Sequence, residues 1–277
     1  MLLLRMAFAG VLCAATASAQ PCSVADVRGT YLYQATGSSA QVPARALGLV
    51  QFDGSGQATG RMMITIGGVL GAGTFTYEFS EFTIQVNPDC TGQAQYRLKS
   101  DGDTLLGPDK LNILVLDEGA RIWGQVTESP GRTVFMTAEF QRLGRGSHVC
   151  TQSMIRGTYL FRYDGWINQQ VMNPRAAAAF VPAIANGFLA IDPEAGTLTG
   201  GGSSNWGGTI LHTVLKTAGF QVNADCSGTY DYQMQVVESN ANMSGTMPII
   251  VAENGDRLIA LQTALPALIV YERISIP

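Results

Sequence analysis

The sequence predicts an all-β protein built from two tandem eight-stranded antiparallel up-and-down barrels. The first observation is a duplication: Arg-Gly-Thr-Tyr-Leu-Tyr at 28–33 returns as Arg-Gly-Thr-Tyr-Leu-Phe at 156–161. In the same order, Val-Asn-Pro-Asp-Cys-Thr-Gly at 86–92 returns as Val-Asn-Ala-Asp-Cys-Ser-Gly at 222–228. The second observation is that short strand-like runs alternate with turn signals, while no window has a sustained helical period. The chain therefore contains two copies of one β unit.

Each copy contains eight runs with strand character. In the first copy they are 29–35, 46–53, 57–66, 74–86, 92–99, 111–117, 121–128 and 133–142. In the second they are 157–163, 186–192, 197–202, 209–222, 228–237, 247–252, 256–263 and 267–273. Most connections have hairpin length and turn chemistry, such as Asp-Gly-Ser-Gly at 53–56, so neighbouring strands are expected to pair antiparallel. A barrel leaves no exposed edge, whereas an open sandwich shares these cues and is the alternative.

The N-terminus predicts export. Residues 1–19 combine a positive Arg5, a short apolar stretch at 6–15 and Ala-Ser-Ala at 17–19, which is the pattern of a secretory signal peptide. The apolar stretch is too short to span a bilayer. We therefore expect a secreted protein, periplasmic or extracellular, without stable membrane insertion. Its two barrel domains are predicted at 20–145 and 146–277, joined by a short linker near 143–148.

Four cysteines remain after the predicted signal, and they allow three pairings. Each copy carries one cysteine six residues before its Arg-Gly-Thr-Tyr and one in its Asp-Cys turn. The repeat thus predicts Cys22 with Cys90 and Cys150 with Cys226, each bridge stabilising its unit by about 3 to 4 kcal/mol. Neither copy places two cysteines together or a histidine at ligand spacing, so no metal site is expected.

Composition argues against several function classes. Charged residues are 14% of the chain, the net charge is −4, and no basic cluster exists, so nucleic acid is not an expected partner. Catalytic signals are weak: no Gly-x-Ser-x-Gly motif occurs, His148 falls in the linker, and His212 shares the more polar face of its strand. Glu78, Glu81 and Glu139 have no matched acidic positions in the second copy. We name no catalytic residue and expect no cofactor, and whether the protein is an enzyme stays open.

A family resemblance rests on three residues in each copy. Gly29 and Tyr31 open the first strand and Arg142 closes the last, as Tyr159 and Arg273 do in the second copy. This pattern resembles the calycin barrels, in which lipocalins place a Gly-x-Trp under an arginine of the last strand. It also looks like the allene oxide cyclase type of barrel, which closes a fatty-acid epoxide into a ring. The resemblance implies that each arginine stacks on its tyrosine as a structural cap.

The aromatic faces of the predicted strands suggest a ligand-binding lumen. An eight-stranded barrel holds one small ligand or is filled by its own side chains. The candidate ligand-binding residues are Tyr31, Tyr33, Tyr96, Tyr159, Phe161, Tyr163, Tyr230 and Tyr232. The preferred hypothesis is a carrier or binder of a small apolar molecule. The alternatives are a cofactor-free cyclase or isomerase of the allene oxide cyclase type, and a structural or surface-interaction module with filled barrels.

The second copy has an insertion between its first two strands. Residues 165–181 replace the shorter stretch 37–42 of the first copy. The run 175–180 follows Asn-Pro and is rich in alanine, which predicts a short helix. In a lipocalin-like barrel this connection lies over the mouth, so the insertion is a candidate lid, or else an element that packs between the barrels.

Overall fold

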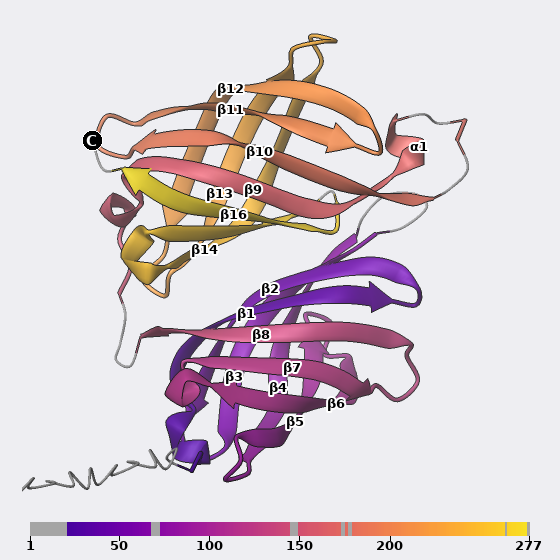
Figure 1. Ribbon diagram of the computed structural model, residues 1–277, viewed down its shortest axis with the longest axis vertical. Helices are drawn as coiled ribbons and strands as arrows, with labels where there is room; N and C mark the ends of the chain where they lie inside the picture. Colours follow the sequence, from indigo (N-terminus) through magenta and orange to yellow (C-terminus); the bar gives the residue numbers. More distant parts are fainter. Residues whose placement is uncertain are drawn as a thin grey trace, which may run out of the picture.

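The protein folds into two closed eight-stranded antiparallel barrels in tandem, which confirms the predicted fold class. The computed structural model describes residues 21–67, 73–144, 149–172, 175–176, 179–263 and 265–275. The predicted signal peptide and His148 therefore lie outside the described residues. Figure 1 shows the second barrel above the first.

In the first barrel every strand pairs with its neighbour in sequence, and β8 returns to β1, so the sheet has no free edge. Its strands are β1 (Arg28–Ser39), β2 (Val42–Asp53), β3 (Gln57–Ile66), β4 (Gly73–Val86), β5 (Thr91–Ser100), β6 (Leu105–Leu116), β7 (Arg121–Glu128) and β8 (Val134–Gly144). The short 3-10 helices η1 (Val24–Asp26) and η2 (Asp117–Gly119) lie at one end, called here the floor. The opposite end is the mouth.

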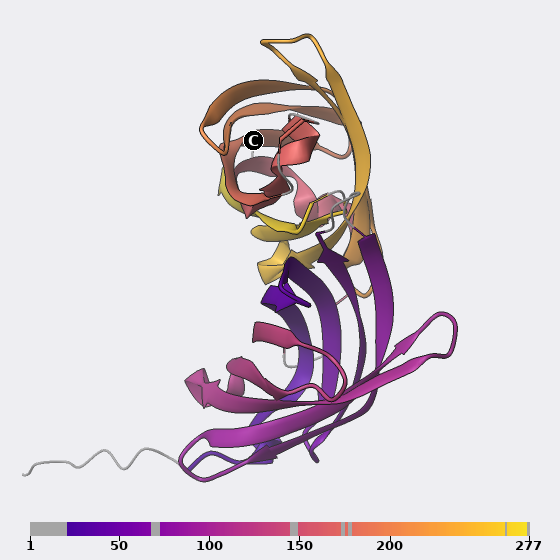
Figure 2. The ribbon, with the colours of Figure 1, turned by 90° about the vertical axis from the view of Figure 1, so that its right-hand side faces the viewer.

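The second barrel repeats this plan. Its strands are β9 (Gly157–Asn168), β10 (Phe180–Asp192), β11 (Thr197–Trp206), β12 (Thr209–Val222), β13 (Ser227–Val236), β14 (Asn242–Ala252), β15 (Arg257–Gln262) and β16 (Ala267–Ser275). The 3-10 helices η3 (Gln152–Ile155) and η4 (Glu253–Gly255) occupy its floor, and α1 (Gln169–Met172) follows β9. Figure 2 looks onto the mouth of this barrel, with α1 at the rim.

The predicted helix at 175–180 is wrong. The described residues of this run form a turn and bend at 175–176, and Phe180 already belongs to β10. The reason is the length of the ladder, since β9 and β10 stay paired up to Asn168 and Phe180. Beyond the last pair, the backbone N–H of Gln169 donates to the carbonyl oxygen of Ala179, so the end of the run continues the ladder, and the helical turn forms earlier, at α1. Residues 173, 174, 177 and 178 lie outside the described residues.

A tyrosine and an arginine seal each floor. The Tyr31 hydroxyl donates to the carbonyl oxygen of Gly119 at 2.6 Å and accepts from Nε of Arg142 at 3.0 Å. In the second barrel Tyr159 donates to Gly255 at 2.6 Å. The guanidinium groups lie 5.4 and 5.5 Å from the centroids of the two tyrosine rings. The cation–π stacking that the resemblance implied is confirmed in both barrels.

Each barrel has its own disulfide, as the repeat predicts. Cys22 is bonded to Cys90 and Cys150 to Cys226, with Cα–Cα distances of 5.0 and 4.9 Å. The recurring Asp-Cys-Thr/Ser turn presents the second cysteine of each pair. In the second copy the Asp225 carboxylate accepts from the backbone N–H of Ser227 at 3.0 Å, which holds Cys226 at a φ of +70°. The bridge ties the segment before the first strand to the turn between the fourth and fifth.

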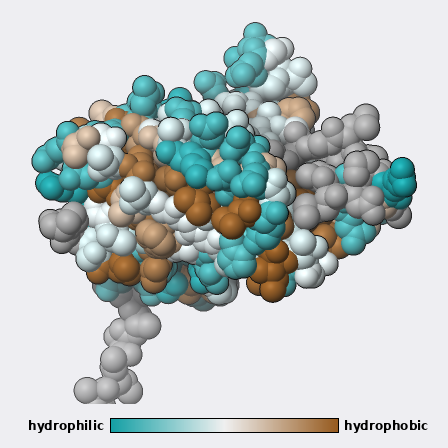
Figure 3. Space-filling view, turned by 90° about the horizontal axis from the view of Figure 1, so that it is seen from above, coloured by the Kyte–Doolittle hydropathy of each residue, from teal (hydrophilic) through white to brown (hydrophobic). Residues whose placement is uncertain are grey.

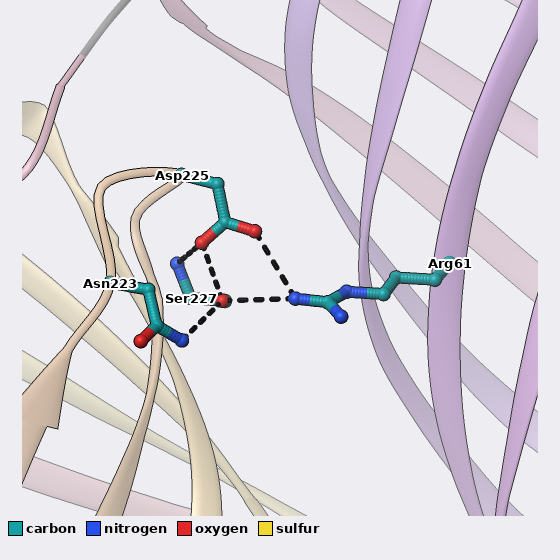
Figure 4. Close-up of polar contacts among 4 residues, drawn as sticks. All are labelled: Arg61, Asn223, Asp225 and Ser227. Carbon is teal, nitrogen blue, oxygen red and sulfur yellow. Dashed lines mark hydrogen bonds and ion pairs between the residues drawn. The ribbon is translucent and has the colours of Figure 1, made fainter.

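The two barrels pack through an apolar contact with polar groups around it. The first contact face consists of Leu32, Leu47, Leu49, Met63 and Leu143. The second contact face, on β14 to β16, consists of Ile250, Ile259, Leu261, Leu268 and Val270. Arg61 of the first barrel reaches Asp225 at 3.1 Å and Ser227 at 3.2 Å, as Figure 4 shows. Thr65 donates to the carbonyl oxygen of Gln262 at 3.0 Å. These contacts join β1–β3 to the outside of the second barrel.

We predict that the paired substitution Cys150→Ser and Cys226→Ser lowers the free energy of unfolding by about 3 to 4 kcal/mol, because the bridge closes a loop with a sequence separation of 76. Urea denaturation of the purified protein measures the loss. Peptide mapping under non-reducing conditions is the control on pairing, and a fragment that joins Cys22 to Cys150 contradicts the assignment.

Candidate functional site

The interior of the first barrel is filled by its own side chains. Its packed rings are Tyr33, Phe52, Phe79, Phe82, Tyr96 and Phe140. Neighbouring ring centroids in this group lie 5.0 to 6.2 Å apart, the spacing of aromatic rings in direct contact. A cavity between these side chains has a volume of about 50 Å³. It lies beside the buried carboxylate of Asp109, which is paired with Arg132. The first barrel therefore matches the filled-barrel alternative.

At some inner positions the second barrel has smaller side chains than the first, although Tyr163, Tyr230 and Ile269 replace the smaller Ala35, Ala94 and Ala138. Pairing registers identify these positions. Met62 pairs with Gly48 in the first barrel, and Gly202 pairs with Gly187 in the second, so Gly202 is the counterpart of Met62. By the same correspondence Ile64 becomes Ser204, Phe79 becomes Leu215 and Phe82 becomes Ala218. A cavity of about 100 Å³ lies where these side chains are shortened. The cavity of the second barrel is thus about twice as large as that of the first.

Aromatic rings and methionines line this cavity. Its principal lining residues are Phe161, Tyr163, Tyr230, Met234, Met243, Met247 and Tyr271. The Phe161 ring lies over β11, because a side chain at Gly202 would come within 2.7 Å of it. Methionine side chains are flexible and polarisable, so they adapt to the shape of an apolar guest. The wall is suited to a small apolar molecule.

One residue that lines this cavity has a polar group without a partner among the described residues. The hydroxyl of Tyr163 is buried and makes no hydrogen bond among the described residues. The side chain is only 7% exposed, and burial raises its pKa, so the phenol stays protonated at neutral pH. Leaving a buried hydroxyl unpaired costs about 1 to 3 kcal/mol. The equivalent position in the first barrel is Ala35, so this feature belongs to the second copy alone.

The predicted ligand-binding residues fall into three groups. Phe161, Tyr163 and Tyr230 line the cavity of the second barrel. Tyr33 and Tyr96 lie in the packed interior of the first, beside its smaller cavity.

The other three have structural contacts. Tyr31 and Tyr159 belong to the floors, where their hydroxyls are already hydrogen-bonded. Tyr232 accepts a hydrogen bond from Nε2 of Gln262 at 3.1 Å. The sequence thus predicts the right residue types, while the structure brings only part of the set together.

Sequence reasoning missed several lining residues. Tyr271 lies two positions before Arg273 on β16, so strand alternation places both on the inner face, and this signal was available. Met243 and Met247 come from β14, whose predicted start at 247 was five residues too late. The sequence alone did not indicate that Gly202 lines the cavity, because this becomes visible only when Gly202 is compared with its counterpart Met62 in the first barrel.

The remaining chemical candidates do not form a site. His212 is exposed, as predicted, and its ring nitrogen contacts the carboxylate of Glu238. Across the described ranges, no group of three His, Cys, Asp or Glu side chains is placed to hold a metal ion. No helix in the described part of the chain is long and apolar enough to cross a membrane.

Comparisons with known proteins add little to the site. No protein-family model matches the sequence, and no curated protein matches it. Among solved structures, the chain is similar to a protein from Nitrosomonas europaea described as a "putative AttH", with 7% identity and a TM-score of 0.28. The match covers 88% of this chain and 92% of that one. A likeness at this level carries no inference about function.

Two tyrosine substitutions are expected to have different effects on the free energy of unfolding, because one removes a hydrogen-bonded hydroxyl and the other an unpaired one. Tyr159→Phe removes the bond to Gly255 and should lower the free energy of unfolding by about 1 to 3 kcal/mol. Tyr163→Phe removes a hydroxyl without a partner and should leave stability unchanged or raise it by up to about 1 kcal/mol. Urea denaturation of both variants beside the parent protein makes the comparison. Equal destabilisation by the two substitutions would show that the Tyr163 hydroxyl has a structural partner.

Proposed function

We propose that the second barrel binds one small, mainly apolar molecule that forms a hydrogen bond with the hydroxyl of Tyr163. The first barrel acts as a filled structural partner. The observation that carries this proposal is a cavity of about 100 Å³ whose wall contains a buried, unpaired phenol. Ligand sites typically combine apolar walls with a few polar groups that fix orientation.

The size of the cavity limits the ligand. An engineered apolar cavity of about 150 Å³ accepts benzene, and common ligand pockets begin at about 300 Å³. The cavity of about 100 Å³ therefore suits a molecule no larger than a single ring. A fatty-acid epoxide is much larger than this space. The cavity volume thus gives no support to the allene oxide cyclase alternative.

The chemistry of the wall favours binding over catalysis. The described lining residues include no Asp, Glu, His or Lys. Burial raises the pKa of Tyr163, Tyr230 and Tyr271, which keeps their phenols protonated at neutral pH. A general base must accept a proton near the working pH, and these phenols are poorly suited to that role. They are suited to orienting a guest through hydrogen bonds.

We also propose that the protein acts in an oxidising compartment, periplasmic or extracellular. Two disulfides, one in each barrel, support this proposal, because such bonds persist where thiols are not kept reduced. The predicted signal peptide at 1–19 is consistent with the same location.

Phenol and benzene provide a direct test of ligand binding. The ring of each fits a small apolar cavity, but only phenol can pair with Tyr163. We expect phenol to bind the parent protein about 2- to 10-fold more tightly than benzene, the range that one net hydrogen bond supplies. In Tyr163→Phe this preference should disappear while benzene still binds. Binding is followed by perturbation of NMR signals from residues of β9, β11 and β13.

Two further variants test the place of binding. Leu215→Phe restores the ring that Phe79 provides in the first barrel, and it should fill the cavity and abolish binding of both probes. Tyr33→Phe, which removes a phenol from the filled barrel, is the matched control and should leave binding unchanged. Phenol binding that survives Leu215→Phe with unaltered affinity would refute the second barrel as the site.

A further inference from the structure

The residues that form the contact between the two barrels have counterparts in the other copy, and several of these counterparts are exposed on the outer surface. Because the chain is a duplication, each residue of the first contact face has a counterpart on the second barrel. Pairing registers match Leu32 and Leu49, which are cross-strand neighbours, to Leu160 and Phe188. Ile274, which follows the floor arginine, is the counterpart of Leu143.

These counterparts remain hydrophobic although they are exposed among the described residues. Leu32 is fully buried between the barrels, whereas Leu160 is 52% exposed. Phe188 and Ile274 are 51% and 58% exposed. Figure 3 shows hydrophobic residues among hydrophilic ones on the upper side of the second barrel. Leu160, Phe188 and Ile274 are named here the outer donor face.

The complementary face is repeated on the first barrel. Ile250 and Ile259, cross-strand neighbours in the second contact face, correspond to Leu114 and Trp123. Ile250 and Ile259 are 4% and 0% exposed. Their counterparts Leu114 and Trp123 are 39% and 54% exposed. Leu114 and Trp123 are named here the outer acceptor face.

We propose that the outer donor face of one copy binds the outer acceptor face of another, so that chains associate head to tail. The occupant is a second copy because the structure already contains this contact once, between its own barrels. The two kinds of face do not compete on one barrel: the first contact face centres on β2, and the acceptor positions of the same barrel lie on β6 and β7. Such a heterologous contact builds an open chain or a ring of molecules rather than a symmetric dimer.

The contact between copies is weaker than the one within the chain. Leu47 is replaced by Asn186, Met63 by Ser203 and Leu261 by Gln125 at the equivalent positions. Arg61, which binds Asp225 inside the chain, is replaced by Gly201. Association is therefore reversible and depends on concentration.

Complementation between two disabled variants tests the proposal. Phe188→Asp disables the donor face and leaves the acceptor face intact, while Trp123→Asp does the reverse. Both side chains are about half exposed, so the barrels should stay folded, which circular dichroism checks. By sedimentation velocity, the parent protein should form larger species as its concentration rises. Each variant alone should weaken association at least about tenfold. A mixture of the two should form a 1:1 dimer and nothing larger.

Two additional variants sharpen the result. Asn186→Leu restores the equivalent of Leu47 and should strengthen association, and adding Trp123→Asp should cancel this gain. Val237→Asp changes another exposed residue, 52% accessible and away from both faces, and should have no effect. A parent protein that stays monomeric at its highest soluble concentration overturns the proposal. So does a mixture of the two disabled variants that remains monomeric, or association that Phe188→Asp leaves unchanged.

Discussion

The closure of each barrel at its floor is the constraint on which the rest depends. The tyrosine of the first strand, the glycine between the sixth and seventh strands and the arginine of the last strand meet at one point. Only glycine fits there: Gly119 has a φ of +77°, and a Cβ would lie 2.2 Å from the carbonyl oxygen of Asp26. Gly255 is equally confined, with a φ of +89° and the carbonyl oxygen of Met154 at 2.0 Å. Because the floor fixes the relative position of first and last strands, inner side chains face one another at set distances.

Within this fixed frame, the distribution of large and small side chains differs between the two barrels. The first barrel packs Phe79 and Phe82 against Tyr96, whereas the second has Leu215 and Ala218 at the same places. The larger side chains of the second barrel, such as Tyr163 and Tyr230, come from other strands than the ones it has lost, so space is left beside Leu215. The unpaired Tyr163 hydroxyl belongs to a residue that lines this space, and these two features together support the proposed binding site.

The sequence predicted the fold well because its signals are local. Turn residues, alternation and the repeated Asp-Cys turn each act over a few positions, and the duplication doubled the evidence. Strand limits were less accurate: β6 begins at Leu105 and not at 111, since its early residues pair with β5 although their pattern is irregular. The site was predicted only in part, because whether Tyr33 or Phe161 faces a cavity depends on residues from distant strands. No local pattern reports that the space filled by Met62 in the first barrel is taken by the Phe161 ring beside Gly202 in the second.

Alternation along a strand lets the inside and the outside of the second barrel change independently after duplication. On β10, Leu189 is buried and lines the cavity, while its neighbour Phe188 is half exposed and also borders the cavity. A substitution at one position leaves the other side of the sheet in place. Retention of apolar residues at Leu160 and Ile274, which do not border the cavity, is thus not explained by packing of the interior. Because exposed apolar patches carry a cost in solubility and aggregation, their coincidence with positions that are buried in the other copy points to a contact surface. The same frame then supports a cavity through its inner positions and association through its outer ones.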